Sequence, residues 1–114
     1  MDFLIKIFKA LANEHRVKLL HTLMNQGEKE ISKLAHETGV PYKTAARDLK
    51  ILEKTNFVIS RRWQGLVYYS LRSESGLEYN KTLYNLILKR YRRVPYDSHF
   101  PTKVRKPRIQ RIKV

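Results

Sequence analysis

Apolar residues along the first half of the chain recur at the spacing of amphipathic helices. Residues at positions i, i+3, i+4 and i+7 share one face of a helix. In the first predicted helix these positions are apolar, namely Leu4, Ile7, Phe8 and Leu11. Asn13 can cap a second helix, which ends at Gly27, and a third, shorter helix ends at Gly39. Pro41 is typical of a helix start, so we predict a fourth helix from there to Lys54.

The pattern changes after the fourth helix, where β-branched and aromatic residues stand on both sides of a glycine-containing turn. This pattern predicts a β-hairpin in which residues 57–62 pair with residues 66–71. Ser73 can cap a last helix over residues 74–93. The predicted fold class is therefore mostly α with a small β-hairpin, in the order four helices, two strands and a final helix.

The chain has 114 residues, which suits one domain with a single core. We expect residues 1–94 to form this domain and residues 95–114 to form a basic tail, because prolines occur there without a helical period. The sequence has no cysteine, so disulfides and thiolate metal sites are excluded. There is no apolar run of the roughly 20 residues that span a bilayer and no signal-peptide pattern, so we expect a cytoplasmic protein without a membrane partner.

Residues 30–54 have the pattern of two helices that cross at close range through a tight turn. The second of these helices has an apolar stripe at Ala45, Leu49 and Leu52. Opposite this stripe, four cations recur at i, i+4, i+7 and i+11, namely Lys43, Arg47, Lys50 and Lys54. Its first turns also carry residues that would meet base edges in a major groove, namely Tyr42, Thr44 and Ala46. A cationic stripe on a helix is more often simply a solvated face, so the stripe alone does not identify a DNA-binding site.

The hairpin that follows favours the DNA-binding interpretation. Arg61 and Arg62 precede a projecting turn that holds Trp63, Gln64 and Gly65 at its tip. A helix-turn-helix followed at once by a basic hairpin is a winged helix-turn-helix. In such proteins the second helix enters the major groove, and the hairpin, or wing, reaches the DNA backbone or the minor groove. We therefore expect the recognition helix at about residues 41–54 and the wing contacts at residues 61–66.

The charge of the chain fits a polyanionic partner. The formal net charge is +14, and such a charge attracts nucleic acid over a Debye length or more. An anionic membrane or an acidic protein would be attracted in the same way, so charge alone does not identify the partner. The tail has cations but no acid after Ser98, namely Lys103, Arg105, Lys106, Arg108, Arg111 and Lys113. It is expected either to follow DNA phosphates as an arm or to pack on its own dimer.

Three ordered blocks of the sequence resemble the ArsR family of transcriptional regulators. They are FKALANEHRVKLL at residues 8–20, YKTAARDLKILEKTNFV at residues 42–58 and RRWQGLVYYSL at residues 61–71. The resemblance covers about residues 5–72, and it implies a dimeric winged-helix repressor of transcription. Such a repressor binds double-stranded DNA, most simply at a palindromic operator. It also implies DNA contacts on the wing and at five positions of the fourth helix, namely Tyr42, Lys43, Thr44, Ala46 and Arg47.

The chain departs from the family where many members bind metal. Glu30 and Ser32 stand at the positions of a cysteine pair, and they cannot form a soft thiolate site. Asp97 and His99 form one Asp-x-His pair beyond the last helix, without a second pair. The remaining histidines are scattered and are expected on the surface or in packing, namely His15, His21 and His36. We therefore expect a member that does not sense metal and has no cofactor.

The last helix has more apolar residues than the core of one small domain requires, and the first helix has the same excess. We therefore expect a homodimer, because a two-fold partner is the simplest cover for both faces. The expected interface lies at five apolar residues of these helices, namely Leu4, Phe8, Leu83, Ile87 and Tyr91. The alternative is that the tail folds back over the same faces.

Two other functions fit parts of the pattern. A non-specific nucleic-acid-binding architectural protein would use the charge without recognising an operator. A winged-helix protein-interaction module would use the fold without DNA, but it would not need the cationic stripe of the fourth helix. An enzyme is not expected, because the sequence has no P-loop, no HExxH motif, no cysteine nucleophile and no clustered carboxylates.

Overall fold

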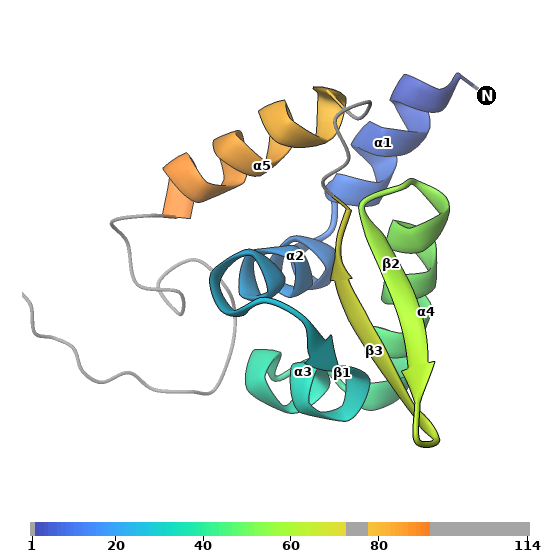
Figure 1. Cartoon of the computed structure of the whole chain (residues 1–114). Coiled ribbons are helices and arrows are strands. Elements are labelled where there is room, and N and C mark those ends of the chain that lie inside the picture. The colour runs from blue at the N-terminus through green and yellow to red at the C-terminus, as the bar shows by residue number, and fades with distance from the viewer. Residues whose placement is uncertain (1, 73–77, 92–114) are drawn as a thin grey trace, which may run out of the picture.

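The computed structural model describes residues 2–72 and 78–91, which form five helices and a three-stranded sheet (Figure 1). The helices are α1 (Phe3–Leu11), α2 (Glu14–Gln26), α3 (Ile31–Thr38), α4 (Tyr42–Lys54) and α5 (Glu78–Tyr91). The strands are β1 (Lys29–Glu30), β2 (Val58–Trp63) and β3 (Leu66–Leu71).

Local signals in the sequence explain where the helices begin and end. Asn13 caps α2, because its side-chain oxygen accepts a hydrogen bond from the backbone N–H of Arg16 at 3.1 Å. Gly39 follows α3 at a φ of 74°, a left-handed conformation that turns the chain toward α4. Pro41 immediately precedes α4. These boundaries confirm the four helices predicted for the first half of the chain.

β3 is the central strand of an antiparallel sheet whose order is β1-β3-β2. β2 and β3 form the predicted hairpin, with the first strand shifted by one residue to 58–63. β1 was not predicted from the sequence. It contains only Lys29 and Glu30, which pair with Tyr69 and Tyr68, and two residues are too short to show an alternating pattern.

Helix α5 contacts the junction between α4 and β2 through backbone carbonyl groups. The side-chain amide of Asn80 donates a hydrogen bond to the carbonyl oxygen of Asn56 at 2.6 Å. The hydroxyl group of Tyr84 lies 2.7 Å from the carbonyl oxygen of Phe57 and 3.1 Å from that of Arg72. In Figure 1, α5 lies on the same side as α1 and far from the hairpin tip. Ser73, the ends of the predicted helix and the tail (residues 95–114) lie outside the described residues.

The core lies among α2, α3, α4 and the base of the hairpin. Its fully buried side chains include Leu19, Leu20, Leu34, Leu49, Leu52, Phe57 and Val58. The crossed pair of α3 and α4, followed by the β2-β3 hairpin, is the predicted winged helix-turn-helix fold. Within residues 2–72 and 78–91, no helix is long and apolar enough to cross a membrane.

Candidate nucleic-acid interface

Helix α4 has a buried face and a cationic face, as the sequence predicted. Ala45, Leu49 and Leu52 are fully buried. The cations of the opposite face are all exposed, and we call them the cationic stripe: Lys43, Arg47, Lys50 and Lys54. Among the described residues, none of these four forms an ion pair with a carboxylate. Tyr42 is exposed beside them, while Thr44 and Ala46 are half-buried.

The two acidic residues of α4 make their contacts with other parts of the fold. Asp48 is buried on the side of the helix that packs on the core. Glu53 accepts a hydrogen bond from the hydroxyl group of Ser60 on β2 at 3.0 Å. Among the described residues, no carboxylate forms an ion pair with the cationic stripe, which favours a polyanionic partner.

Asp48 forms an ion pair that connects α4 to the corner between α1 and α2. Its Oδ1 atom accepts a hydrogen bond from the Arg16 guanidinium at 2.9 Å. The same guanidinium donates to the carbonyl oxygen of Ala10 at 2.6 Å, at the end of α1. Only 14% of the Arg16 side chain and 5% of the Asp48 side chain are exposed. A buried ion pair of this kind fixes α4 against the first two helices.

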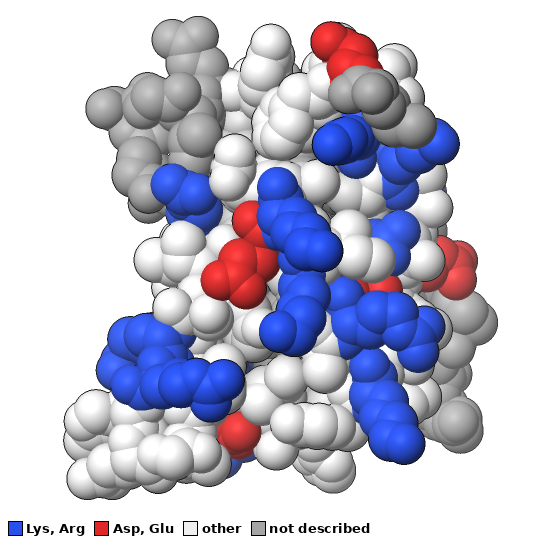
Figure 2. Space-filling view, turned by 90° about the vertical axis from the view of Figure 1, so that its right-hand side faces the viewer, with Lys and Arg blue, Asp and Glu red and all other residues white. Residues whose placement is uncertain are grey.

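The face that carries α4 and the hairpin is rich in basic side chains. Figure 2 shows Lys and Arg side chains gathered across the middle of this face, with Asp and Glu side chains at few places. Helix α4 contributes the exposed cationic stripe to this side of the molecule. This distribution matches the electrostatic footprint of a nucleic-acid-binding surface.

The two arginines of the wing, which the sequence analysis treated alike, have different surroundings. Arg61 donates two hydrogen bonds to the Glu28 carboxylate, at 2.7 and 2.8 Å, and it lies opposite Tyr68 on the outer face of the hairpin. The hydrogen bond from Arg61 lowers the pKa of Glu28, and the same bond raises the pKa of Arg61. Arg62 points to the other face, which it shares with Ser60, next to α4. Arg62 is therefore the wing cation placed to extend the cationic stripe.

The wing ends in a tight turn. Gln64 and Gly65 both have positive φ angles, 52° and 78°, as a two-residue hairpin turn requires. Trp63 and Leu66 pair across the hairpin next to this turn, and both are exposed. The structure thus brings the predicted wing residues to one projecting tip, except that Arg61 is engaged by Glu28.

The residues predicted for a dimer interface divide into exposed and buried groups. Leu4 and Phe8 are exposed on α1, whereas Leu83 and Tyr91 are half-buried on α5. Ile87 lies on the face of α5 that packs against the core, and only 8% of it is exposed. The exposed apolar residues of the two helices also include Phe3, Ile5, Tyr79 and Leu86. A dimer contact on α5 would therefore be centred on its exposed face, and the contact itself stays a prediction.

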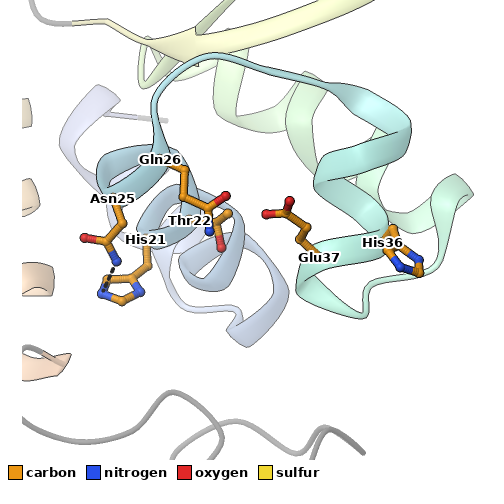
Figure 3. Close-up of a pocket in the computed structure, with 6 residues that line it drawn as sticks. All are labelled: His21, Thr22, Asn25, Gln26, His36 and Glu37. Atoms are coloured by element: carbon orange, nitrogen blue, oxygen red, sulfur yellow. Dashed lines mark hydrogen bonds between the residues drawn. The ribbon is translucent and has the colours of Figure 1, made fainter.

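The three histidines that the structure describes do not gather into a metal site, namely His15, His21 and His36. His21 is buried on α2, where its ring is 3.3 Å from the Asn25 amide nitrogen, and burial lowers its pKa. A hollow of about 580 Å³ separates it from His36 on α3, whose ring points away from His21 (Figure 3). Within residues 2–72 and 78–91, no three His, Asp or Glu side chains gather to form a metal site. The Asp97-x-His99 pair lies outside the described residues.

Three polar residues of this region were missed in the sequence analysis. Asp48 occupies the position of the apolar stripe between Ala45 and Leu49, and an acid at a core position is itself a signal of a buried cation. The partners Arg16 and Glu28 are far from Asp48 and Arg61 in the sequence, so no local pattern indicates these pairs.

Comparisons with known proteins agree with this geometry. The sequence model described as "Bacterial regulatory protein, arsR family" matches residues 13–60. The chain is 34% identical over 74 residues to the HTH-type transcriptional regulator Rv0324 of Mycobacterium tuberculosis, a match that covers 65% of this chain and 32% of that protein. It is 35% identical over 69 residues to the cadmium resistance transcriptional regulatory protein CadC homolog of Staphylococcus aureus, covering 60% of this chain and 57% of that protein. The chain thus spans less than two thirds of the length of either relative.

A solved structure is similar over most of the described fold. It is the solution structure of the homodimeric winged helix-turn-helix DNA-binding domain Mb0332 from Mycobacterium bovis, a possible ArsR-family transcriptional regulator. The sequence identity is 31%, the TM-score is 0.66, and the match covers 77% of each chain.

Proposed function

Because the chain belongs to the ArsR family of bacterial regulatory proteins, we propose that it is a transcriptional regulator that forms a homodimer and binds specific sequences of double-stranded DNA. The observation that carries the proposal is the exposed cationic stripe of α4, which lies opposite a fully buried apolar stripe and beside a projecting wing. A regulator with this surface would act on the chromosome, so the proposal includes a cytoplasmic location.

In the proposed complex, α4 enters the major groove and the wing lies along the backbone or in the minor groove. The N-terminal turns of α4 meet base edges through Tyr42, Lys43, Thr44, Ala46 and Arg47. Lys50 and Lys54, farther along the helix, contact phosphates, as does Arg62 on the wing. Base contacts supply the sequence preference, and phosphate contacts supply affinity that depends on salt.

The homodimer is supported by exposed apolar residues on α1 and α5, which the described part of one protomer leaves uncovered. The similar domain from Mycobacterium bovis is itself homodimeric. Two copies related by a two-fold axis would present two recognition helices to one duplex, so a palindromic operator follows from the symmetry. Repression is the finer part of the proposal, and it requires an operator that overlaps a promoter.

A second candidate is non-specific binding of nucleic acid, which the net charge of +14 favours. Selection of bound duplexes from a random DNA pool at moderate salt separates the two functions. Operator recognition predicts enrichment of one palindromic sequence that is still bound when random duplexes have been released. Recovery of a pool without any enriched sequence would support non-specific binding instead.

Variants of the cationic stripe test how α4 contacts the selected duplex. Arg47→Ala should cost about 1–3 kcal/mol on the operator and relax one base position, because a bidentate contact with guanine is lost. Lys54→Ala should weaken binding to operator and random duplexes alike and reduce the salt slope by about 0.9 per lost phosphate contact. Lys89→Ala is the matched control, because it removes an exposed cation from α5, away from the hairpin (Figure 1). Equal losses on both duplexes for Arg47→Ala would remove this residue from base recognition.

A further inference from the structure

The tip of the wing exposes apolar surface that neither the core nor the cationic stripe explains. Trp63 and Leu66 pair across the hairpin next to the turn, and they are 53% and 45% exposed. Contact with water makes this surface unfavourable, and at the end of the projecting hairpin the described residues of the protomer leave it uncovered. The tip therefore has the properties of a contact surface for a partner.

The Trp63 side chain is supported by its neighbours on the outer face of the hairpin. Its ring meets the Tyr68 ring edge-on, with the centroids 6.5 Å apart. The Arg61 guanidinium lies over the Tyr68 ring, 5.0 Å from its centroid, and the Glu28 carboxylate holds that guanidinium with two hydrogen bonds. These contacts extend from the loop before β1 to the wing tip. They order the indole before any partner binds, so less conformational entropy is lost on binding.

We propose that Trp63, with Leu66 beside it, inserts as an apolar wedge between base pairs in the minor groove next to the major groove that α4 occupies. This inference rests on the proposed function and adds the means by which the wing contributes to it. Apolar side chains that enter the minor groove unstack a base step and kink the duplex toward the major groove. The wedge thus supplies a contact that no hydrogen-bonding residue of the wing can make.

Charge and the layout of the outer face favour DNA over a protein as the partner of the tip. Arg62 and the cationic stripe of α4 lie on the opposite face of the hairpin, and they attract the phosphates of a duplex that reaches the tip. A protein partner would be expected to use a continuous apolar face. On the outer face, however, the Arg61–Glu28 ion pair stands between the tip and the next exposed apolar residue, Ile59.

A wedge gives sequence preference through DNA deformability. Pyrimidine–purine steps unstack more easily than other steps, so the operator should have such a step where the wing lies. Replacing that step with a stiff A-tract should weaken binding even though α4 keeps all its base contacts.

Trp63 is the only tryptophan in the chain, so its fluorescence reports directly on the wedge. The full-length protein is titrated with the duplex selected in the experiment above, and binding is followed by the anisotropy of a label on the DNA. The wedge predicts that tryptophan emission is strongly quenched in step with binding, and that acrylamide no longer reaches the indole in the complex. It also predicts that dyes at the two ends of the duplex move closer together on binding.

Variants separate the wedge from a general loss of the wing. Trp63→Ala should bind the operator about tenfold more weakly, in line with the loss of one stacked base, and should leave the duplex unbent. Trp63→Phe, which keeps an aromatic ring, should restore most of both effects. Ile59→Ala is the matched control, because Ile59 is 44% exposed on the same face but lies at the base of the hairpin. It should bind and bend the duplex as the wild type does.

The outcomes are distinguishable from failure of the proposed function. If the protein binds the selected duplex while its emission and the end-to-end distance stay unchanged, the wedge is overturned and the regulator stands. If no duplex is bound at all, both fail. The emission measurement uses the wild-type protein, so it decides the question even if a Trp63 variant does not fold.

Discussion

The ion pair between Arg16 and Asp48 should be worth more to the structure than its single hydrogen bond suggests. Asp48 lies on α4 with 5% of its side chain exposed; Arg16 donates a hydrogen bond to its Oδ1 atom, and the His15 ring nitrogen Nδ1 lies 4.0 Å from its Oδ2 atom. The Arg16 guanidinium also donates to the carbonyl oxygen of Ala10. We therefore expect Arg16→Met, which keeps the length of the side chain but removes its charge, to be strongly destabilising.

The expected magnitude follows from the burial of the two groups. Breaking a buried ion pair by removing one partner costs about 3–5 kcal/mol, because the remaining charge stays in the protein without compensation. Asp48→Asn should cost less, about 1–2 kcal/mol, since Arg16 keeps its bond to Ala10 and part of its access to water. The double variant Arg16→Met with Asp48→Leu should regain most of the stability, because it leaves no buried charge.

Urea unfolding followed by circular dichroism measures these differences, with every variant at the same protein concentration because the stability of a homodimer would depend on it. Arg47→Met is the matched control, since it removes an exposed cation from α4 that has no carboxylate partner among the described residues. Its effect should stay within about 0.5 kcal/mol. A cost below about 1 kcal/mol for Arg16→Met, or single-variant costs that simply add in the double variant, would refute the reasoning.

Three shorter tests concern the apolar face of α5, the wing and a buried histidine. Leu86→Glu should convert the proposed dimer to a monomer in light scattering, because an unpaired charge would be buried in the interface at a cost of several kcal/mol. Lys89→Glu is the control, and a Leu86→Glu variant that is still dimeric would place the interface elsewhere. Glu28→Gln should release Arg61 for phosphate, so the salt slope of DNA affinity should steepen by about 0.9 per new contact, and an unchanged slope would contradict this. Burial lowers the pKa of His21 below its ordinary value of 6.5, so the unfolded chain takes up the proton first. Stability should therefore be greatest above pH 6.5 and decrease as the pH falls from 6.5 toward the lowered folded-state pKa, and His21→Gln should flatten this part of the profile of melting temperature against pH.

The parts of the fold that local chemistry determines could be predicted from the sequence. Asn13, Gly39 and Pro41 mark helix boundaries through caps and backbone preferences that involve only their neighbours, and the structure has the boundaries there. The cationic stripe of α4 also follows from helical spacing alone. By contrast, β1 exists only because Lys29 and Glu30 pair with residues far along the chain, so no local pattern indicates it.

The site was less predictable where the outcome depends on which way a helix or strand faces. Leu86 and Ile87 are both apolar, and only packing of α5 on the rest of the fold decides that Ile87 is buried while Leu86 is 61% exposed. Arg61 and Arg62 are adjacent and identical, and the register of the hairpin sends them to opposite faces. The engagement of Arg61 then depends on Glu28, whose proximity is a property of the folded chain.

The way in which α5 contacts the corner between α4 and the wing bears on how this protein can change during evolution. Asn80 and Tyr84 bind the carbonyl oxygens of Asn56, Phe57 and Arg72, and every amino acid supplies such an oxygen. These contacts therefore do not constrain the side chains that the wing presents. Under the proposed function, substitutions along β2 and β3 would alter the preferred DNA sequence while the frame that orients the wing is retained. A designer who wishes to retarget the protein can vary the exposed positions of the hairpin as a set, provided that Asn80 and Tyr84 are left in place.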